Sequence, residues 1–349
     1  MAKDIKIYML HKYIKSVDDI YQSLHISQND IHFIWDDQNP DYIIATEWIY
    51  YEPKLYQKFM SLQCSEVINI FFAGECLEPD LNIFDYAIVF DNDLQLNDRI
   101  CKIPTLEFFH KYVTEELYKK TNNPSEILRQ KTKFCNFIYS NGKAHPNRDK
   151  LFYKISEYKK VDALGQHLRN IEVADYFVDE RVKKDYKFTI ASENACYRGY
   201  TSEKLLLAFQ AHTVPIYWGD PDIEKFFNPK AFINANKMSF DEVVEKVKEL
   251  DNNDELYCQM LSEPPMTEQQ KQIEYQVFIS NIFMQSKENA KRVAEGFHPE
   301  NYRRFAKTLI SQDVYNPQQQ DNWLYSITSS KGKVSVYLGK YKILSYHKG

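Results

Sequence analysis

Short apolar runs rich in β-forming residues alternate with longer helical patterns, and this alternation restricts the fold more than any other feature of the chain. In the first third the runs are "DIKIYML", "IHFIW", "PDYIIAT", "VINIFFAG" and "YAIVF". Strands that alternate with helices predict an α/β domain with a largely parallel sheet. The chain has 349 residues, which exceeds the size at which a single hydrophobic core stops growing. We therefore expect two domains.

The same pattern restarts after the polar segment "YKKTNNPSEILRQ", where we place the domain boundary. Beyond it, "KFCNFIYSN", "KFTIASEN", "TVPIYWGDP" and "AFINAN" predict strands of a second sheet. Helical patterns at 148–158, 202–212 and 240–250 separate them, and Ser239 with Glu242 is a capping-box signature for the last helix. We expect α/β domains at 1–125 and 126–290 with a cleft between them. Residues 291–349 are expected to form a C-terminal helix and a tail that ends in a hairpin.

Charge and cysteine content narrow the range of partners. The net charge of -5 lacks the basic excess of nucleic-acid binders, so we expect no nucleic acid partner. No run approaches the roughly 20 apolar residues of a membrane span, and the amino terminus lacks a signal-peptide pattern. We expect a cytoplasmic protein, with peripheral association at the inner face of the membrane left open. The six cysteines form no metal-site pattern, which favours buried free thiols and no structural zinc.

The segment from 187 to 218 reads as a strand, a polar loop, a helix and a second strand. In open α/β sheets, ligands bind where the carboxyl end of a strand meets the amino terminus of a helix. The free amide groups and the dipole at the start of a helix favour the binding of phosphate. Lys204 would add a positive charge there, Glu203 is suited to a sugar diol, and Gly199 permits close backbone approach. These residues predict a nucleotide-diphosphate pocket. The alternative is that Glu203 and Lys204 are ordinary charges of a first helical turn.

The stretch "SENACYRGYTSEK", followed by "AFQAHTVPIYWGDPDIEKFFNPKAFIN", resembles the donor-binding signature of the α-1,3/1,4-fucosyltransferases, glycosyltransferase family 10. Two more segments, "FFAGECLEPDLNIFDYAIVFD" and "SNGKAHPNRDKLFYKIS", also resemble the family, so that the resemblance covers roughly residues 70–265. Ser192 replaces the family's usual Phe, and Thr201-Ser202 replaces Val-Thr.

The resemblance implies a GT-B fold: two Rossmann-like domains, the first holding the acceptor sugar and the second holding GDP-fucose. Carried over by position, Arg148 and Lys204 would neutralise the diphosphate, and Glu203 would hold the ribose hydroxyls. Asn194 and Tyr200 would contact the phosphates or the fucose. The family needs no cofactor and no essential divalent metal, since GDP-fucose is a substrate. "DND" at 91–93 is interpreted as a polar turn and not as a metal site.

Glu75 aligns with the family's general base, and Glu78 is its rival. The activity implied is inverting transfer of L-fucose to a GlcNAc or Glc hydroxyl of a glycan, with α-1,3 linkage, in bacterial lipopolysaccharide, oligosaccharide or glycoprotein synthesis. One alternative is a related glycosyltransferase that uses another nucleotide sugar. The other is a non-catalytic glycan- or nucleotide-binding protein on a GT-B scaffold. The oligomeric state, the acceptor and the role of 291–349 are not defined by the sequence.

The aromatic run "EWIYYEPKLY" favours a core or helix face, with sugar contact by Trp48, Tyr50 or Tyr51 as the alternative. His145 is interpreted as a bystander of the donor segment, and Arg198 has no assigned role.

Overall fold

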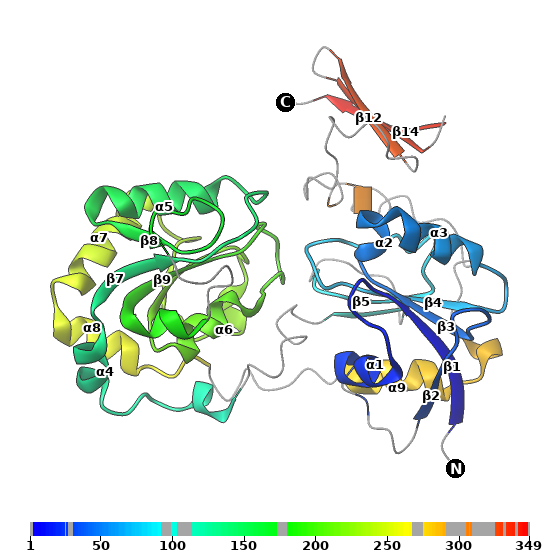
Figure 1. The fold of residues 1–349 in the computed structure, drawn as a ribbon, viewed down its shortest axis with the longest axis horizontal. Helices are drawn as coiled ribbons and strands as arrows, with labels where there is room; N and C mark the ends of the chain where they lie inside the picture. The colour runs from blue at the N-terminus through cyan, green and yellow to red at the C-terminus, as the bar shows by residue number, and fades with distance from the viewer. Residues whose placement is uncertain are drawn as a thin grey trace.

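The computed structural model describes residues 3–24, 26, 31–91, 99–102, 114–172, 180–266, 275–290, 305–306, 308, 325–330, 333–338 and 341–347. Two parallel sheets lie in separate lobes, and a small antiparallel sheet comes last in the chain (Figure 1). The first two thirds of the chain therefore have the α/β architecture that the alternating pattern predicts.

The first sheet has six parallel strands in the order β2-β1-β3-β4-β5-β6. Its strands are β1 (Lys3–Leu10), β2 (Ile31–Trp35), β3 (Tyr42–Ala45), β4 (Ile68–Phe72), β5 (Tyr86–Val89) and β6 (Ile100–Lys102). Its helices before β5 are α1 (Val17–Leu24), α2 (Trp48–Tyr51) and α3 (Pro53–Ser61). Every residue of β3, β4 and β5 is buried, as expected for a parallel sheet covered on both faces. Helix α1 covers one face, and α2 and α3 cover the other.

The second sheet has the order β11-β10-β9-β7-β8, and all of its strands are parallel. Its strands are β7 (Lys133–Phe137), β8 (Val161–Ala163), β9 (Tyr186–Ser192), β10 (Val214–Trp218) and β11 (Ile233–Asn234). Its helices are α4 (Pro124–Gln130), α5 (Asn147–Tyr158), α6 (Glu203–Gln210), α7 (Phe240–Asp251) and α8 (Asp254–Ser262), with 3-10 turns η3 (Glu115–Tyr118), η4 (Glu180–Asp185) and η5 (Ile223–Lys225).

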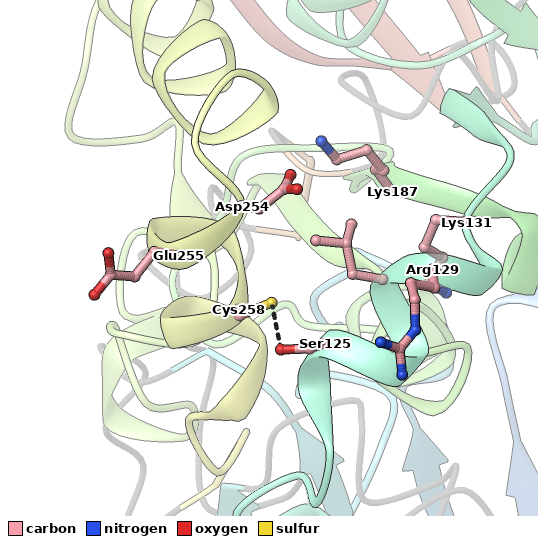
Figure 2. A pocket seen from close by; sticks show the side chains of 8 residues that line it. Ser125, Arg129, Lys131, Lys187, Asp254, Glu255 and Cys258 are labelled. Atoms are coloured by element: carbon pink, nitrogen blue, oxygen red, sulfur yellow. Dashed lines mark hydrogen bonds between the residues drawn. The ribbon is translucent and has the colours of Figure 1, made fainter.

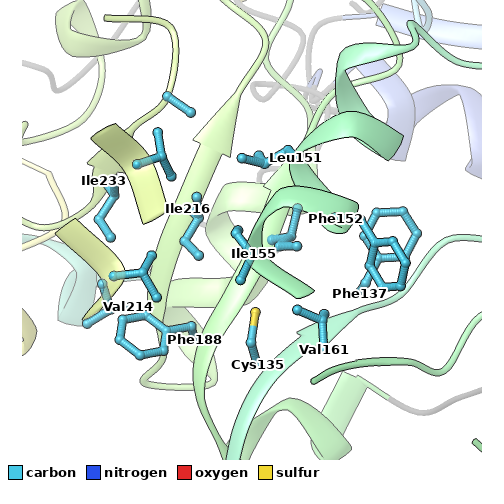
Figure 3. Packing of buried hydrophobic residues seen from close by; sticks show 14 of the residues in the cluster. Cys135, Phe137, Leu151, Phe152, Ile155, Val161, Phe188, Val214, Ile216 and Ile233 are labelled. Atoms are coloured by element: carbon cyan, nitrogen blue, oxygen red, sulfur yellow. The ribbon is translucent and has the colours of Figure 1, made fainter. Parts of the chain in front are cut away.

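The main core of this lobe lies between the sheet and α5, α7 and α8 (Figure 3). Ile155 of α5 packs there with Phe188 of β9 and Ile216 of β10, all nearly inaccessible to solvent. Helix α6 covers the opposite face with Leu205 and Leu206. The helices predicted at 148–158 and 240–250 are confirmed, and the capping box of Ser239 and Glu242 is present. The short strand β8 was not predicted, because its three residues, "VDA", carry too little pattern.

Helix α9 (Tyr275–Met284) packs on the first sheet and not on the second. Its Ile279, Ile282 and Phe283 lie in the core with the strands of the first lobe, on the face that α1 covers. The sequence-based division had assigned these residues to the second domain. An apolar helix face predicts burial, but it does not identify the sheet against which the helix is buried.

The terminal sheet is antiparallel and has three strands, β12 (Tyr325–Ser330), β13 (Lys333–Leu338) and β14 (Tyr341–His347). The predicted hairpin corresponds to β13 and β14, and β12 adds a strand that the alternation did not reveal. A 3-10 turn, η7 (Lys287–Asn289), follows α9. No helix in the described part of the chain is long and apolar enough to cross a bilayer.

Candidate active site

The strand order of the second sheet defines a switch point between β7 and β9. From β7 the chain crosses to β8 on one side, and then returns to β9 on the other side. In doubly wound sheets, ligands bind at such a point, beyond the carboxyl ends of the two strands. The loop after β7 leads to Arg148, and the loop after β9 leads to Lys204. The topology therefore brings the predicted donor residues to one edge of one sheet.

Glu193 is the first residue after β9, and the sequence analysis did not select it. It is fully buried, and its carboxylate accepts hydrogen bonds from the Ser202 amide at 2.8 Å and the Ser202 hydroxyl at 2.6 Å. Burial raises the pKa of Glu193, although the charge of Lys204 opposes that shift. A Cβ atom on Gly219 would stand 2.4 Å from Cγ of Glu193, so the close approach of β10 requires glycine. The signal for Glu193 was its position directly after a buried strand.

Lys204 lies in the first turn of α6 and is held by the same network. Its Nζ donates to Ser202 Oγ at 2.8 Å and lies 3.4 Å from Glu193 Oε2 and 3.7 Å from Glu203 Oε1. Burial alone would lower the pKa of Lys204, but the charges of Glu193 and Glu203 outweigh burial and raise it. The ammonium group therefore remains charged, in a fixed position, with 19% of its side chain exposed.

Arg148 lies in the first turn of α5 and is almost fully buried. Its Nη1 donates to Asn194 Oδ1 at 3.2 Å, its Nη2 donates to the Asn141 carbonyl, and its guanidinium carbon lies 4.5 Å from the centre of the Tyr139 ring. Among the described residues, its Nε has no hydrogen-bond acceptor, although Asp149 lies 3.9 Å away. Arg148 and Asn194 thus meet across the switch point, where contacts from both loops fix the guanidinium group.

Tyr200 reaches the first lobe. Its hydroxyl donates to Glu75 Oε2 at 2.7 Å, and its ring lies edge-on to Phe90 at 5.5 Å. Burial, together with the charge of Glu75, raises the pKa of Tyr200, so the phenol remains a donor. Nearby, the Tyr197 hydroxyl donates to Asp91 at 3.3 Å. The loop that was predicted to bind the donor therefore also docks on the carboxyl edge of the first sheet.

Glu75 is half-buried and lies beside Tyr200, whereas its rival Glu78 is fully buried. The Glu78 amide donates to the Thr308 hydroxyl at 3.1 Å, which ties this residue to the interior. Of the two carboxylates, only Glu75 combines solvent access with a contact to the second lobe.

Glu47 is a second carboxyl group at this edge, and sequence reasoning did not select it. It is 3% exposed, and its Oε2 accepts a hydrogen bond from the Gly74 amide at 3.1 Å. Burial, and then the charge of Glu75, raise the pKa of Glu47 to about 7. In the sequence, Glu47 was visible only as the start of an aromatic run.

An aromatic cluster occupies the switch point of the first sheet, which lies between β1 and β3. Trp48 packs edge-on against His11, Tyr13 and Tyr51 at 5.6–5.9 Å, and Lys12 Nζ lies 5.0 Å from the Trp48 ring centre. Tyr13 is 67% exposed. Tyr50, in contrast, is buried in the core against Phe305, as the core interpretation predicted.

The remaining sequence candidates have structural partners. The His145 ring packs on Trp218 at 4.8 Å, and Arg198 pairs with Asp222 at 3.0 Å. Of the "DND" motif only Asp91 is described, and it is buried.

All six cysteines are free. Two of them, Cys64 and Cys196, are exposed, which corrects the expectation of uniformly buried thiols.

A hollow of about 670 Å³ opens between α4 and α8, lined by Ser125, Leu128, Arg129, Lys131, Lys187, Asp254, Glu255 and Cys258 (Figure 2). Lys131 precedes β7 and Lys187 is near the start of β9, so the hollow lies at the amino ends of the strands. Its lysines are already engaged: Lys187 pairs with Asp251 at 2.9 Å, and Lys131 donates to two carbonyl oxygens. The hollow is therefore a weaker candidate than the switch point.

The geometry defines a two-lobed α/β protein with cations at the carboxyl edge of one sheet and carboxylates at the facing edge of the other. The family model described as glycosyltransferase family 10 (fucosyltransferase) C-term matches residues 128–283. The model described as alpha-(1,3)-fucosyltransferase FucT N-terminal domain matches residues 12–109. The chain belongs to glycosyltransferase family 10.

Individual relatives agree with this assignment. The alpha-(1,3)-fucosyltransferase FucT of Helicobacter pylori is 31% identical over a 240-residue alignment that covers 60% of this chain and 49% of that protein. GDP-fucose protein O-fucosyltransferase 3 of Xenopus laevis is 28% identical over a 146-residue alignment that covers 39% of this chain and 31% of that protein. The matches thus span half or less of these curated relatives. A crystal structure of alpha1,3-fucosyltransferase with GDP-fucose shares the fold, with a TM-score of 0.59, 23% identity, and coverage of 90% of this chain and 92% of that one.

Proposed function

We propose that the protein transfers L-fucose from GDP-fucose to a hydroxyl group of a glycan, with inversion at the anomeric carbon and formation of an α-1,3 linkage. One observation carries the proposal: Arg148 and Lys204 converge at the switch point of the second sheet, while Glu75 is hydrogen-bonded to that lobe's own loop. Two cations on one side and an accessible carboxylate on the other are what an inverting transfer requires.

On the donor side, Arg148 and Lys204 hold the diphosphate. The pyrophosphate accumulates negative charge as GDP leaves, and cations fixed in a partly buried site stabilise that charge without reorganising. Glu203 accepts hydrogen bonds from the ribose hydroxyls, and Asn194 contacts the phosphates or the sugar. Because both cations already carry the positive charge, no divalent metal and no cofactor is required.

In the reaction, the acceptor oxygen forms a bond to C1 of fucose while the bond from C1 to the β-phosphate oxygen breaks. The electron pair of that bond leaves with GDP, and the acceptor proton passes to Glu75. Attack from the face opposite GDP converts the β-linked donor into an α-linked product. Tyr200 donates to Glu75 and so fixes the orientation of the carboxylate.

For the acceptor side, we propose that Tyr13 and Trp48 contact the sugar. They lie at the switch point of the first sheet, and aromatic faces stack on the apolar faces of sugar rings. The names of the H. pylori and Xenopus relatives both state fucosyl transfer, the first with an alpha-(1,3) linkage and the second to a protein. We assign a GlcNAc- or Glc-containing glycan, made on the cytoplasmic side of a bacterial membrane.

The donor assignment is tested by calorimetric titration with GDP, UDP and CMP in the presence of EDTA. GDP is expected to bind most tightly and independently of metal. A preference for UDP would favour a related transferase with another nucleotide sugar. Tight GDP binding without turnover on any acceptor would favour a non-catalytic binding protein.

A further inference from the structure

Glu47 and Glu75 lie at the same edge of the first sheet. They follow β3 and β4, which are parallel neighbours with Ala45 paired to Phe71. Glu47 comes two residues after β3 ends at Ala45, and Glu75 comes three residues after β4 ends at Phe72. The pairing of β3 with β4 thus brings the two carboxyl groups to the same edge of the sheet.

The Glu47 side chain contacts the backbone next to Glu75. The Gly74 amide donates to Glu47 Oε2 at 3.1 Å, and the Glu75 amide also stabilises the charged form of Glu47. A Cβ atom on Gly74 would be 3.3 Å from Glu47 Oε1, so the carboxyl group packs directly over this glycine. Among the described residues, no lysine or arginine pairs with Glu47, and a buried acid without a cation is expensive. Packing alone does not account for an acidic residue at this position, because an apolar side chain would avoid the cost of burying the acid.

We propose that Glu47 is a positioning residue for Glu75: its carboxyl group holds the Gly74–Glu75 turn, and its negative charge favours uptake of the acceptor proton by Glu75. This inference rests on the proposed function, because it assigns Glu47 a part in the transfer step.

The charge of Glu47 changes near neutral pH. Burial and the charge of Glu75 raise the pKa of Glu47 to about 7. Below that pH, Glu47 is neutral and places no charge beside Glu75. Above it, the negative charge of Glu47 lies beside Glu75 and makes proton uptake by Glu75 more favourable.

Other groups share this environment. Tyr200 faces Glu75 through its hydrogen bond, and the charge of Lys204 also acts on Glu75. The Cys76 thiol is buried next to Glu75, with its pKa raised by burial and by the surrounding carboxylates, which include Glu193. The pKa values of Tyr200, Lys204 and Cys76 are raised from ordinary values that already lie well above 7, so these three groups do not titrate near neutral pH. Burial also raises the pKa of Glu193, and the E47Q variant distinguishes an inflection of Glu47 from one of Glu193.

The test is the pH profile of kcat for fucosyl transfer in the wild type, E47Q and E47D, with E52Q as control. Glu52 is a half-buried glutamate nearby that pairs with Lys12 at 3.5 Å, and its variant is expected to match the wild type. Gln resembles the neutral acid, so E47Q should match the wild type at about pH 6 and fall roughly tenfold behind it at about pH 8.5. E47D keeps the charge and should retain the rise above pH 7. GDP affinity should be unchanged in all variants.

A ratio of wild-type to E47Q activity that stays constant across pH would overturn the inference, because a purely structural role lowers activity at every pH alike. Carbon-13 titration of the Glu47 carboxyl group provides a readout without turnover: its midpoint should fall when E75Q removes the neighbouring charge. An unmoved midpoint also overturns the pairing. If the wild type transfers no fucose while the midpoint moves, the proposed function fails and the carboxyl pair stands.

Discussion

The Tyr200 hydroxyl, from the loop that follows β9, donates a 2.7 Å hydrogen bond to Glu75 Oε2, at the end of β4 in the other lobe. Tyr200→Phe removes this bond and leaves the ring packed on Phe90. A hydrogen bond to a charged group contributes about 1.5–3 kcal/mol, so turnover should fall by roughly tenfold or more. GDP affinity should change little. Loss of GDP binding with unchanged turnover would contradict this role and would support the donor contact that the family resemblance implies for Tyr200.

Glu75→Gln keeps the size of the side chain but cannot take the acceptor proton. Turnover should fall by about 10²-fold or more, with GDP affinity preserved, since Glu75 belongs to the other lobe. Steady-state kinetics and calorimetry measure the two effects separately. The matched control is Glu78→Gln, compared per folded molecule because Glu78 is buried. If the Glu78 variant alone is inactive, the base has been misassigned.

Lys204→Met should weaken GDP binding by about 1.5–3 kcal/mol and also destabilise the fold, because it leaves Glu193 buried without its cation. Adding Glu193→Gln removes the buried negative charge that Lys204→Met leaves without a cation. The double variant should recover stability in urea unfolding but not GDP affinity. Recovery of both would mean that Lys204 serves only to neutralise Glu193. Arg148→Ala should weaken GDP binding by a similar amount.

The stability of the protein should also report on Glu47. Its pKa is about 7 in the folded state and about 4.3 in an unfolded chain, so the folded state binds more protons between these values. Stability therefore decreases as pH rises through this window and levels off above it. Glu47→Gln removes this dependence, and its stability relative to wild type should rise by up to about 3 kcal/mol from pH 4 to pH 8. Urea unfolding at both pH values measures the change, and an equal difference at both would contradict it.

Local pattern was sufficient to predict much of this fold. The apolar runs of β4 and β9 and the capping box of α7 depend on near neighbours in sequence, and all were recovered. The position of α9 was not, because its apolar face fits either sheet. In the site, charged residues within the loop that resembles the family were selected in advance. Glu47 was missed because only the pairing of β3 with β4 brings it to Glu75.

The partner of Tyr200 was likewise hidden from the sequence. Tyr200 and Glu75 are 125 positions apart, and no periodic pattern relates a loop of one lobe to a strand end of the other. Resemblance assigned both residues to the site, but it did not predict that one would hold the other. Contacts of this kind depend on how the two lobes are arranged in three dimensions, which local sequence pattern does not reveal.

The central claim is that this chain transfers fucose from GDP-fucose, with Glu75 as base and Arg148 and Lys204 on the leaving group. The most direct measurement incubates the wild type with GDP-fucose, EDTA and a panel of GlcNAc- and Glc-containing oligosaccharides, and follows GDP release together with product mass. The account predicts acceptor-dependent GDP release, an acceptor heavier by one deoxyhexose, and loss of both in Glu75→Gln. No product with any acceptor, or equal product from Glu75→Gln, would contradict it.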